Sequence, residues 1–234
     1  VSFYGSNLAL WEFPNEKSTY HAWFDSGGGG VGDAYDWSVL YIMDSLREKI
    51  VARLTVQAPL RTFAVMAASV GTFFHTCMIG GERDARGAVV FTELTDLSYP
   101  NVYYHVDPLR PAKKGEMAKA GIYPTVEHRR KMLEEFKTAV INHSFSSPCA
   151  NLVREMSTFS WVKLQERLKP AAEKGQHDDH VMAAAGAWYV TKFVRNRIQR
   201  QRKREEQTTL VLGRFGQVIE RRDGRQGAPK PWLV

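Results

Sequence analysis

The order of strand-like and helix-like stretches in the first 106 residues most constrains the fold. Runs rich in Val, Leu, Ile and aromatic residues read as strands, and Asp44 to Glu48 reads as a hairpin turn. Helical periodicity separates the later strands. The predicted strands are 21–24, 37–43, 49–57, 77–79 and 101–106, with helices from Pro59 to about Phe74 and from Arg83 or Asp84 to before Pro100. An antiparallel hairpin followed by a β-α-β-α-β alternation predicts an α/β fold, a mixed β-sheet flanked by helices.

The second half of the sequence is predominantly helical. Thr125 and Pro148 are expected to open two helices, and a third is expected from His177 to about Arg204. Further expectations are an edge strand over 159–164, a polar loop that contains Pro170, and a small hairpin over 208–219. We therefore expect an N-terminal arm over 1–20, a main domain over 21–204, and a basic C-terminal hairpin and tail over 205–234.

Positive charge is concentrated near the C-terminus. The formal net charge is +7, and residues 192–230 hold 12 basic and 4 acidic side chains, which leaves residues 1–191 almost neutral. Such a distribution favours a polyanionic partner. The candidates for contact with a DNA backbone are basic residues in a predicted loop, on a helix and in this basic segment, although solvated faces explain the first two groups equally well. They are Lys113, Lys114, Arg129, Arg130, Lys131, Arg200, Arg202, Lys203 and Arg204.

Several other classes of protein are disfavoured. Cys77 and Cys149 are too few for a disulfide framework, which favours a reducing compartment. The uncharged stretch 62–81 contains too many polar residues and glycines for a membrane span, so we expect no membrane association. Gly27, Gly29 and Gly32 match the spacing of a dinucleotide-binding fingerprint, but a strand rather than a helix follows them.

Acidic residues stand at the ends of elements that would be neighbours in this sheet. Asp25 follows the first predicted strand, Glu82 follows a later one, and Asp178 and Asp179 begin the last long helix. Carboxylate oxygens suit Mg²⁺ or Mn²⁺, and like charges brought together need a cation. Two such ions about 4 Å apart can drive phosphodiester hydrolysis. The simpler interpretation is that Asp178 only caps its helix.

Taken together, several segments resemble the nuclease domain of a tailed-bacteriophage terminase large subunit over about residues 20–190. The helix start His177–Ala184, with two acids before an apolar-Met-Ala run, is the most specific of them. The others are Asp25 with Gly30 and Asp36–Val39, Glu82–Gly87, Arg129–Met132 and Glu155–Phe159. The resemblance implies an RNase H-like fold and a metal-dependent endonuclease that cuts double-stranded concatemeric viral DNA during genome packaging.

The resemblance also implies roles for individual residues. Asp25, Glu82 and Asp179 would be both catalytic residues and metal ligands for two Mg²⁺ or Mn²⁺ ions, with Asp178 assisting. No Gly-x-x-x-x-Gly-Lys-Ser/Thr segment occurs in the sequence, so an isolated nuclease domain without its ATPase motor is expected. Implied partners are the portal protein and the small terminase subunit, in the cytoplasm of an infected bacterium. We expect the isolated domain to be monomeric.

Two alternatives stay open at this point. The chain could be a noncatalytic DNA-binding or packaging module, with its acids serving as helix caps and its basic segment supplying affinity. It could also be another RNase H-like enzyme, such as a junction resolvase, that shares the metal site and prefers a branched substrate.

Overall fold

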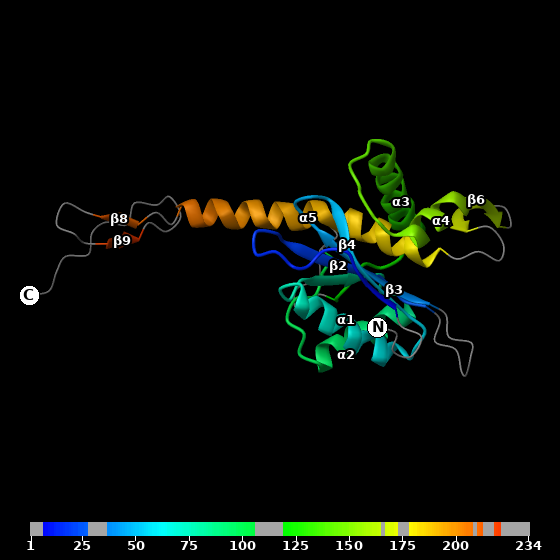
Figure 1. Cartoon of the computed structure of the whole chain (residues 1–234), viewed down its shortest axis with the longest axis horizontal. Coiled ribbons are helices and arrows are strands. Elements are labelled where there is room, and N and C mark those ends of the chain that lie inside the picture. The colour runs from blue at the N-terminus through cyan, green and yellow to red at the C-terminus, as the bar shows by residue number, and fades with distance from the viewer. Residues whose placement is uncertain are drawn as a thin grey trace, which may run out of the picture. The chain divides into compact units, whose positions relative to one another are not determined.

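The computed structural model describes residues 7–27, 37–105, 119–164, 167–172, 178–207, 210–212 and 218–220, with side chains except at 7, 160–172 and beyond 200. The chain divides into two compact units, Val1–Thr191 and Lys192–Val234. The first unit contains the main sheet and the helices that cover it (Figure 1). Within the described residues, no helix combines the length and apolar character needed to cross a membrane.

A five-stranded mixed sheet forms the centre of the first unit. The strands lie in the order β1-β4-β3-β2-β5, and only β2 and β5 run parallel. The pattern of an antiparallel meander joined by a crossover to a parallel strand confirms the predicted α/β class. The bounds are β1 (Asn7–Leu10), β2 (Tyr20–Asp25), β3 (Ser38–Asp44), β4 (Lys49–Val56) and β5 (Met78–Gly81).

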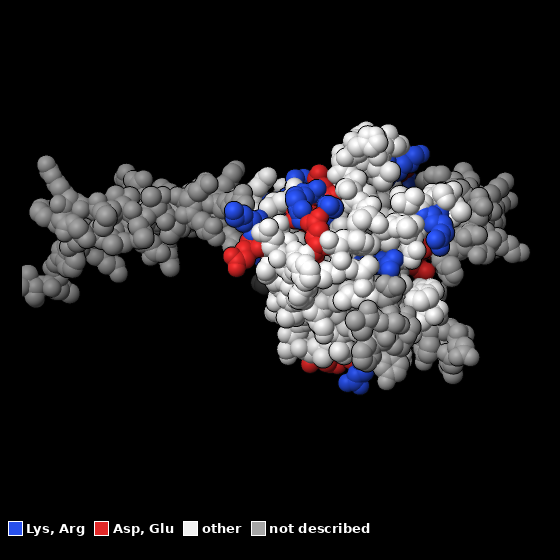
Figure 2. Space-filling model, viewed as in Figure 1, with Lys and Arg blue, Asp and Glu red and all other residues white. Residues whose placement is uncertain are grey.

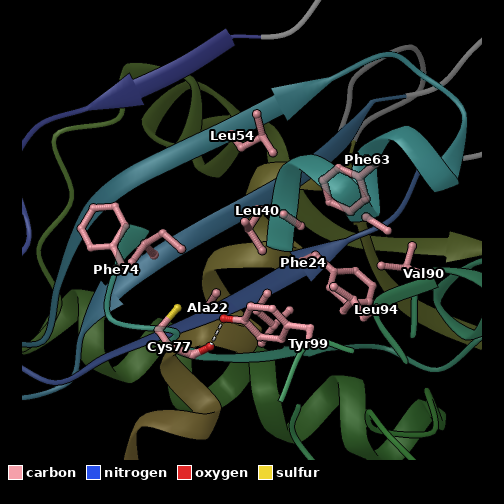
Figure 3. Close-up of a cluster of buried hydrophobic side chains, with 14 of the residues drawn as sticks. Ala22, Phe24, Leu40, Leu54, Phe63, Phe74, Cys77, Val90, Leu94 and Tyr99 are labelled. Atoms are coloured by element: carbon pink, nitrogen blue, oxygen red, sulfur yellow. Dashed lines mark hydrogen bonds between the residues drawn. The ribbon is translucent and has the colours of Figure 1, made fainter. Parts of the chain in front are cut away.

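Both faces of the sheet are covered by other elements, and each face has its own core of buried side chains. Successive side chains of a strand point to opposite faces, so neighbouring residues belong to different cores. Ala22 and Phe24 of β2 belong to the core on one side, which includes side chains of α1 (Leu60–Phe73) and α2 (Ala85–Asp96). Figure 3 shows this cluster, in which the Tyr99 hydroxyl donates to the carbonyl of Cys77 at 2.5 Å. Phe24 lies between helices here, with ring centroids 5.1 Å from Phe91 and 6.0 Å from Phe63.

Trp23 belongs to the core on the opposite face, with side chains of three further helices. These are α3 (Val126–Ile141), α4 (Ala150–Thr158) and α5 (Asp179–Gln207). Asp25 lies two residues after Trp23, so strand alternation places it on the same face as these helices. Asp25, the last residue of β2, therefore lies on the face of the sheet that α5 covers.

Small residues let α5 lie close to the sheet. The segment 183–187 reads Ala-Ala-Ala-Gly-Ala and is completely buried or nearly so. A Cβ at Gly186 would lie 2.0 Å from Nε1 of Trp23, so no side chain fits there without movement. Asp179 lies seven residues before Gly186, which is two helical turns along the same face of α5.

Several local expectations change in the structure. Residues of the expected arm form β1, which pairs with β4 at the sheet edge. The expected strand over 101–106 is reduced to isolated bridges at Val102 and Tyr104, because this segment meets Ile79 on one side and Ala120–Gly121 on the other only briefly. The predicted polar loop around Pro170 is instead β7 (Arg167–Ala172), paired only with β6 (Phe159–Leu164). The expected C-terminal hairpin is present as β8 (Leu210–Leu212) and β9 (Val218–Glu220).

Candidate active site

The carboxyl ends of the two parallel strands bring Asp25 and Glu82 together. Phe24 pairs with Gly81 in the parallel register of β2 and β5, so the next residue on each strand is an acid. The Glu82 peptide is held on both sides by Ile122, which donates its N–H to the Gly81 carbonyl at 3.0 Å and accepts from the Arg83 N–H at 2.7 Å. The sequence prediction that both acids share one sheet edge therefore agrees with the register.

The start of α2 stabilises the same edge. Asp84 caps this helix, and its Oδ1 accepts from the N–H groups of Arg86 at 3.1 Å and Gly87 at 2.7 Å. A Cβ at Gly87 would lie 1.8 Å from the Glu82 carbonyl oxygen. Only glycine allows α2 to begin this close to the backbone of Glu82.

Electrostatics show that α5 brings its two acids to this edge as well. Burial raises the pKa of Asp25 well above its usual range, and the nearby carboxylates of Glu82, Asp179 and Asp178 raise that pKa further. The Arg129 guanidinium opposes the shift. The charges of three other carboxylates thus act on Asp25, and the Arg129 charge acts against them.

Arg129 of α3 is paired with Glu82. Its Nε donates to both carboxylate oxygens at 3.0 Å, and Nη2 donates to Oε2. The Glu82 side chain is 8% exposed, whereas the Arg129 side chain is 45% exposed. The partner of Glu82 is therefore an arginine that the sequence placed among the candidate DNA contacts.

The other predicted DNA contacts have different surroundings. Arg130 is exposed and pairs with Glu134 at 3.3 Å, and Lys131 and Arg200 are exposed. Lys113 and Lys114 lie outside the described residues, and Arg202, Lys203 and Arg204 lie on α5 beyond its described side chains. On the face that Figure 2 shows, the described Lys and Arg side chains lie in separate small groups.

The donor set fits a hard divalent cation in its chemistry, because it consists of clustered carboxylates whose mutual repulsion a cation would relieve. Within the described ranges, no group of three or more His, Cys, Asp or Glu side chains is placed so that it could hold a metal ion. In this structure Glu82 is paired with Arg129.

The N-terminus of α5 is capped from another helix. Asp178 occupies the N-cap position, since its carbonyl accepts from the Met182 N–H at 2.9 Å. The carboxylate that accepts the next free N–H groups belongs to Glu155 of α4, whose Oε2 lies 2.8 Å from the His180 nitrogen and 3.2 Å from that of Val181. The segment 155–159 is part of the resemblance, but neither spacing nor composition indicated a role for Glu155.

The sheet and the helices that cover it have the nuclease fold of phage large terminases. Similar solved structures include the large terminase nuclease of thermophilic phage G20c with bound magnesium, at a TM-score of 0.63 and 13% sequence identity, over 78% of this chain and 86% of that one. The nuclease domain of the large terminase of Thermus phage P74-26 matches with a TM-score of 0.59 and 15% identity, over 78% and 85%. The G20c nuclease has also been solved with bound cobalt (TM-score 0.63, 13% identity, 78% and 86% coverage). No protein-family profile and no curated protein sequence matches the chain.

Proposed function

We propose that this chain is a divalent-metal-dependent endonuclease that cuts double-stranded concatemeric DNA during viral genome packaging. The observation that carries the proposal is that β2 and β5 end side by side in Asp25 and Glu82, while the charges of Asp178 and Asp179 at the start of α5 act on Asp25. The similar terminase nucleases support it, since their structures hold magnesium or cobalt.

In this proposal, Asp25, Glu82 and Asp179 hold two Mg²⁺ or Mn²⁺ ions, and Asp178 assists. The ions, when bound, supply charge stabilisation for the in-line displacement at a phosphodiester. The chain supplies the two adjacent strand ends, the burial of the Glu82 and Asp179 side chains, and the helix α5 that carries Asp178 and Asp179 at its start. Exposed basic side chains such as Arg130 and Lys131 contact phosphates without reading sequence.

The test is cleavage of supercoiled and linear plasmid in Mg²⁺, in Mn²⁺ and in EDTA. We expect cutting only with metal, and its loss in Asp25→Asn and Asp179→Asn. Asp96→Asn, at an exposed position at the end of α2, is the matched control and should cut normally. Persistent cutting by the two site variants would refute the assignment.

Two outcomes would favour other functions. Salt-sensitive DNA binding without cleavage, insensitive to metal and retained by the site variants, would indicate a noncatalytic packaging module served by the basic segment 192–230. Preferential cutting of a four-way junction over linear duplex would indicate a resolvase-type enzyme.

The packaging context is also part of the proposal. Portal protein and small terminase subunit are the proposed protein partners, with action in the cytoplasm of an infected bacterium. Co-purification of the chain with each partner tests this part separately from cleavage.

A further inference from the structure

The first turn of α5 carries two acids of the cluster, so its exact placement matters for the site. The first N–H groups of a helix have no acceptor within the helix and are usually satisfied by the N-cap side chain. Asp178 is at the N-cap, and its residue type is among the best caps. Here, however, the His180 and Val181 N–H groups donate to Glu155.

Glu155, on α4, thus acts as the capping side chain of α5 in place of Asp178. Its carboxylate accepts the two N–H groups that a capping Asp178 side chain would accept. The Asp178 charge is meanwhile close enough to Asp25 to raise its pKa. Because Glu155 provides the cap, the Asp178 side chain can stay close to Asp25.

A buried network ties the same turn to the sheet and to the start of α4. The Tyr41 hydroxyl of β3 lies 2.9 Å from Nδ1 of His180 and 3.1 Å from Sγ of Cys149. Nη1 of Arg53 donates to the same Sγ at 3.3 Å. Cys149 occupies the N-cap position of α4, the helix that carries Glu155. The side chains of Tyr41, Cys149 and His180 are all almost completely buried.

We propose that Glu155 is a positioning residue for the metal site: it caps α5 in place of Asp178 and so keeps Asp178 and Asp179 in the carboxylate cluster. The inference rests on the proposed function. Side chains that orient ligands in this way commonly change metal affinity by about 10- to 100-fold when removed. Removal of Glu155 lets Asp178 turn back to cap its own helix and leave the cluster.

Three substitutions separate the reach of Glu155 from its charge. Glu155→Gln keeps the length and an acceptor oxygen, Glu155→Asp keeps the charge but is one methylene shorter, and Glu155→Ala removes both. Isothermal titration of Mn²⁺ into the full metal-free chain should give an affinity close to wild type for Glu155→Gln. It should be weaker by about tenfold or more for Glu155→Asp and Glu155→Ala.

A second readout needs no metal. In EDTA, amide hydrogen exchange at His180 and Val181 should stay close to the wild-type rate in Glu155→Ala, where Asp178 takes over the cap, and accelerate in the double variant Glu155→Ala/Asp178→Ala. Asp44→Ala is the matched control, since Asp44 also accepts two consecutive N–H groups, from Leu46 at 2.9 Å and Arg47 at 3.1 Å, at the other end of the sheet. It should lower stability and leave both the Mn²⁺ affinity and these two amides unchanged.

The outcomes are distinguishable. Normal Mn²⁺ affinity in Glu155→Ala and Glu155→Asp would overturn the inference and leave the proposed function intact. Weak binding in Glu155→Gln with normal binding in Glu155→Asp would also overturn it, because the charge rather than the cap would then be required. Failure of the wild-type chain to bind Mn²⁺ would remove the proposed function, and the inference with it.

Discussion

Arg129 and Glu82 form a two-oxygen ion pair across 47 positions of sequence, with Nε of the arginine 3.0 Å from both carboxylate oxygens. The carboxylate is buried and the guanidinium about half exposed. Breaking such a pair from the arginine side leaves a buried charge without compensation.

We therefore expect Arg129→Gln to lower the free energy of unfolding in EDTA by about 1–3 kcal/mol, less than for a fully buried pair because water reaches the guanidinium. Saturating Mg²⁺ should reduce this loss, since a cation then neutralises Glu82. Urea denaturation with and without metal measures both effects. Arg130→Gln is the control, because its exposed pair with Glu134 is worth about 0–1 kcal/mol and should not depend on metal. An equal loss for Arg129→Gln in EDTA and in Mg²⁺ would contradict cation binding at Glu82.

Stability should decrease as the pH falls below about 6.5, owing to His21. Burial lowers the pKa of His21 to about 4, and its ring contacts Ser45 Oγ at 2.7 Å and the Ala187 carbonyl at 2.8 Å. The unfolded chain binds a proton near pH 6.5 that the folded chain binds only near pH 4, so stability is complete above 6.5 and is lost towards 4. The loss approaches roughly 3 kcal/mol at most.

Comparison of the wild type with His21→Asn isolates this contribution from the carboxylates that titrate in the same range. Urea denaturation at pH 7, 5.5 and 4.5 should show a steeper fall for the wild type. His143→Asn, at an exposed position, should follow the wild-type curve. Parallel curves for the wild type and His21→Asn would disprove the assignment.

Gly186→Ala should disturb both packing and site. The added Cβ would meet Nε1 of Trp23 at 2.0 Å, so α5 has to shift and carry Asp179 with it. Overpacking of this kind costs about 1–3 kcal/mol. Mn²⁺ affinity should fall too. In a Trp23→Phe background the cost of Gly186→Ala should be smaller, and a double-mutant cycle by thermal unfolding measures the coupling. Additive effects would show that the indole does not limit the approach of α5.

Both cysteines should resist alkylation in the folded protein. Cys77 and Cys149 are free and buried, and burial raises the pKa of the Cys77 thiol to about 12. Thiolate is the reactive form, so little of Cys77 reacts at pH 8. Maleimide labelling followed by mass spectrometry should show both thiols protected in buffer and labelled in urea. Rapid labelling of the native protein at Cys77 would contradict this burial.

The sequence was sufficient to predict that Asp25 and Glu82 lie at the ends of neighbouring strands. Asp25 and Glu82 each follow a short apolar run, and parallel neighbours place such ends at one edge. The partner of Glu82 could not be predicted, because the position of α3 over that edge depends on tertiary packing rather than on spacing. The same holds for Glu155, whose contact with α5 joins two helices separated by β6 and β7.

Some strands of the fold were likewise predictable from the sequence and others were not. Hydrophobic composition was sufficient to predict β2, β3 and β4, and the tight turn at Ser45–Glu48 that joins β3 to β4 was also predicted. Composition was insufficient for β7, because Arg167, Lys169 and Pro170 read as loop residues and only pairing with β6 makes them a strand. β1 was not predicted, because Asn7–Leu10 is short and its pairing partner β4 lies more than forty residues later in the sequence.

The carboxylate cluster draws on β2, on the end of β5 and on the start of α5, segments that leave the ribosome far apart in time. A nascent chain can complete its sheet long before Asp178 and Asp179 emerge, and until then Asp25 and Glu82 face each other without the helix that finishes their surroundings. Synthesis itself therefore delays the appearance of the proposed cutting centre until the start of α5 has been made.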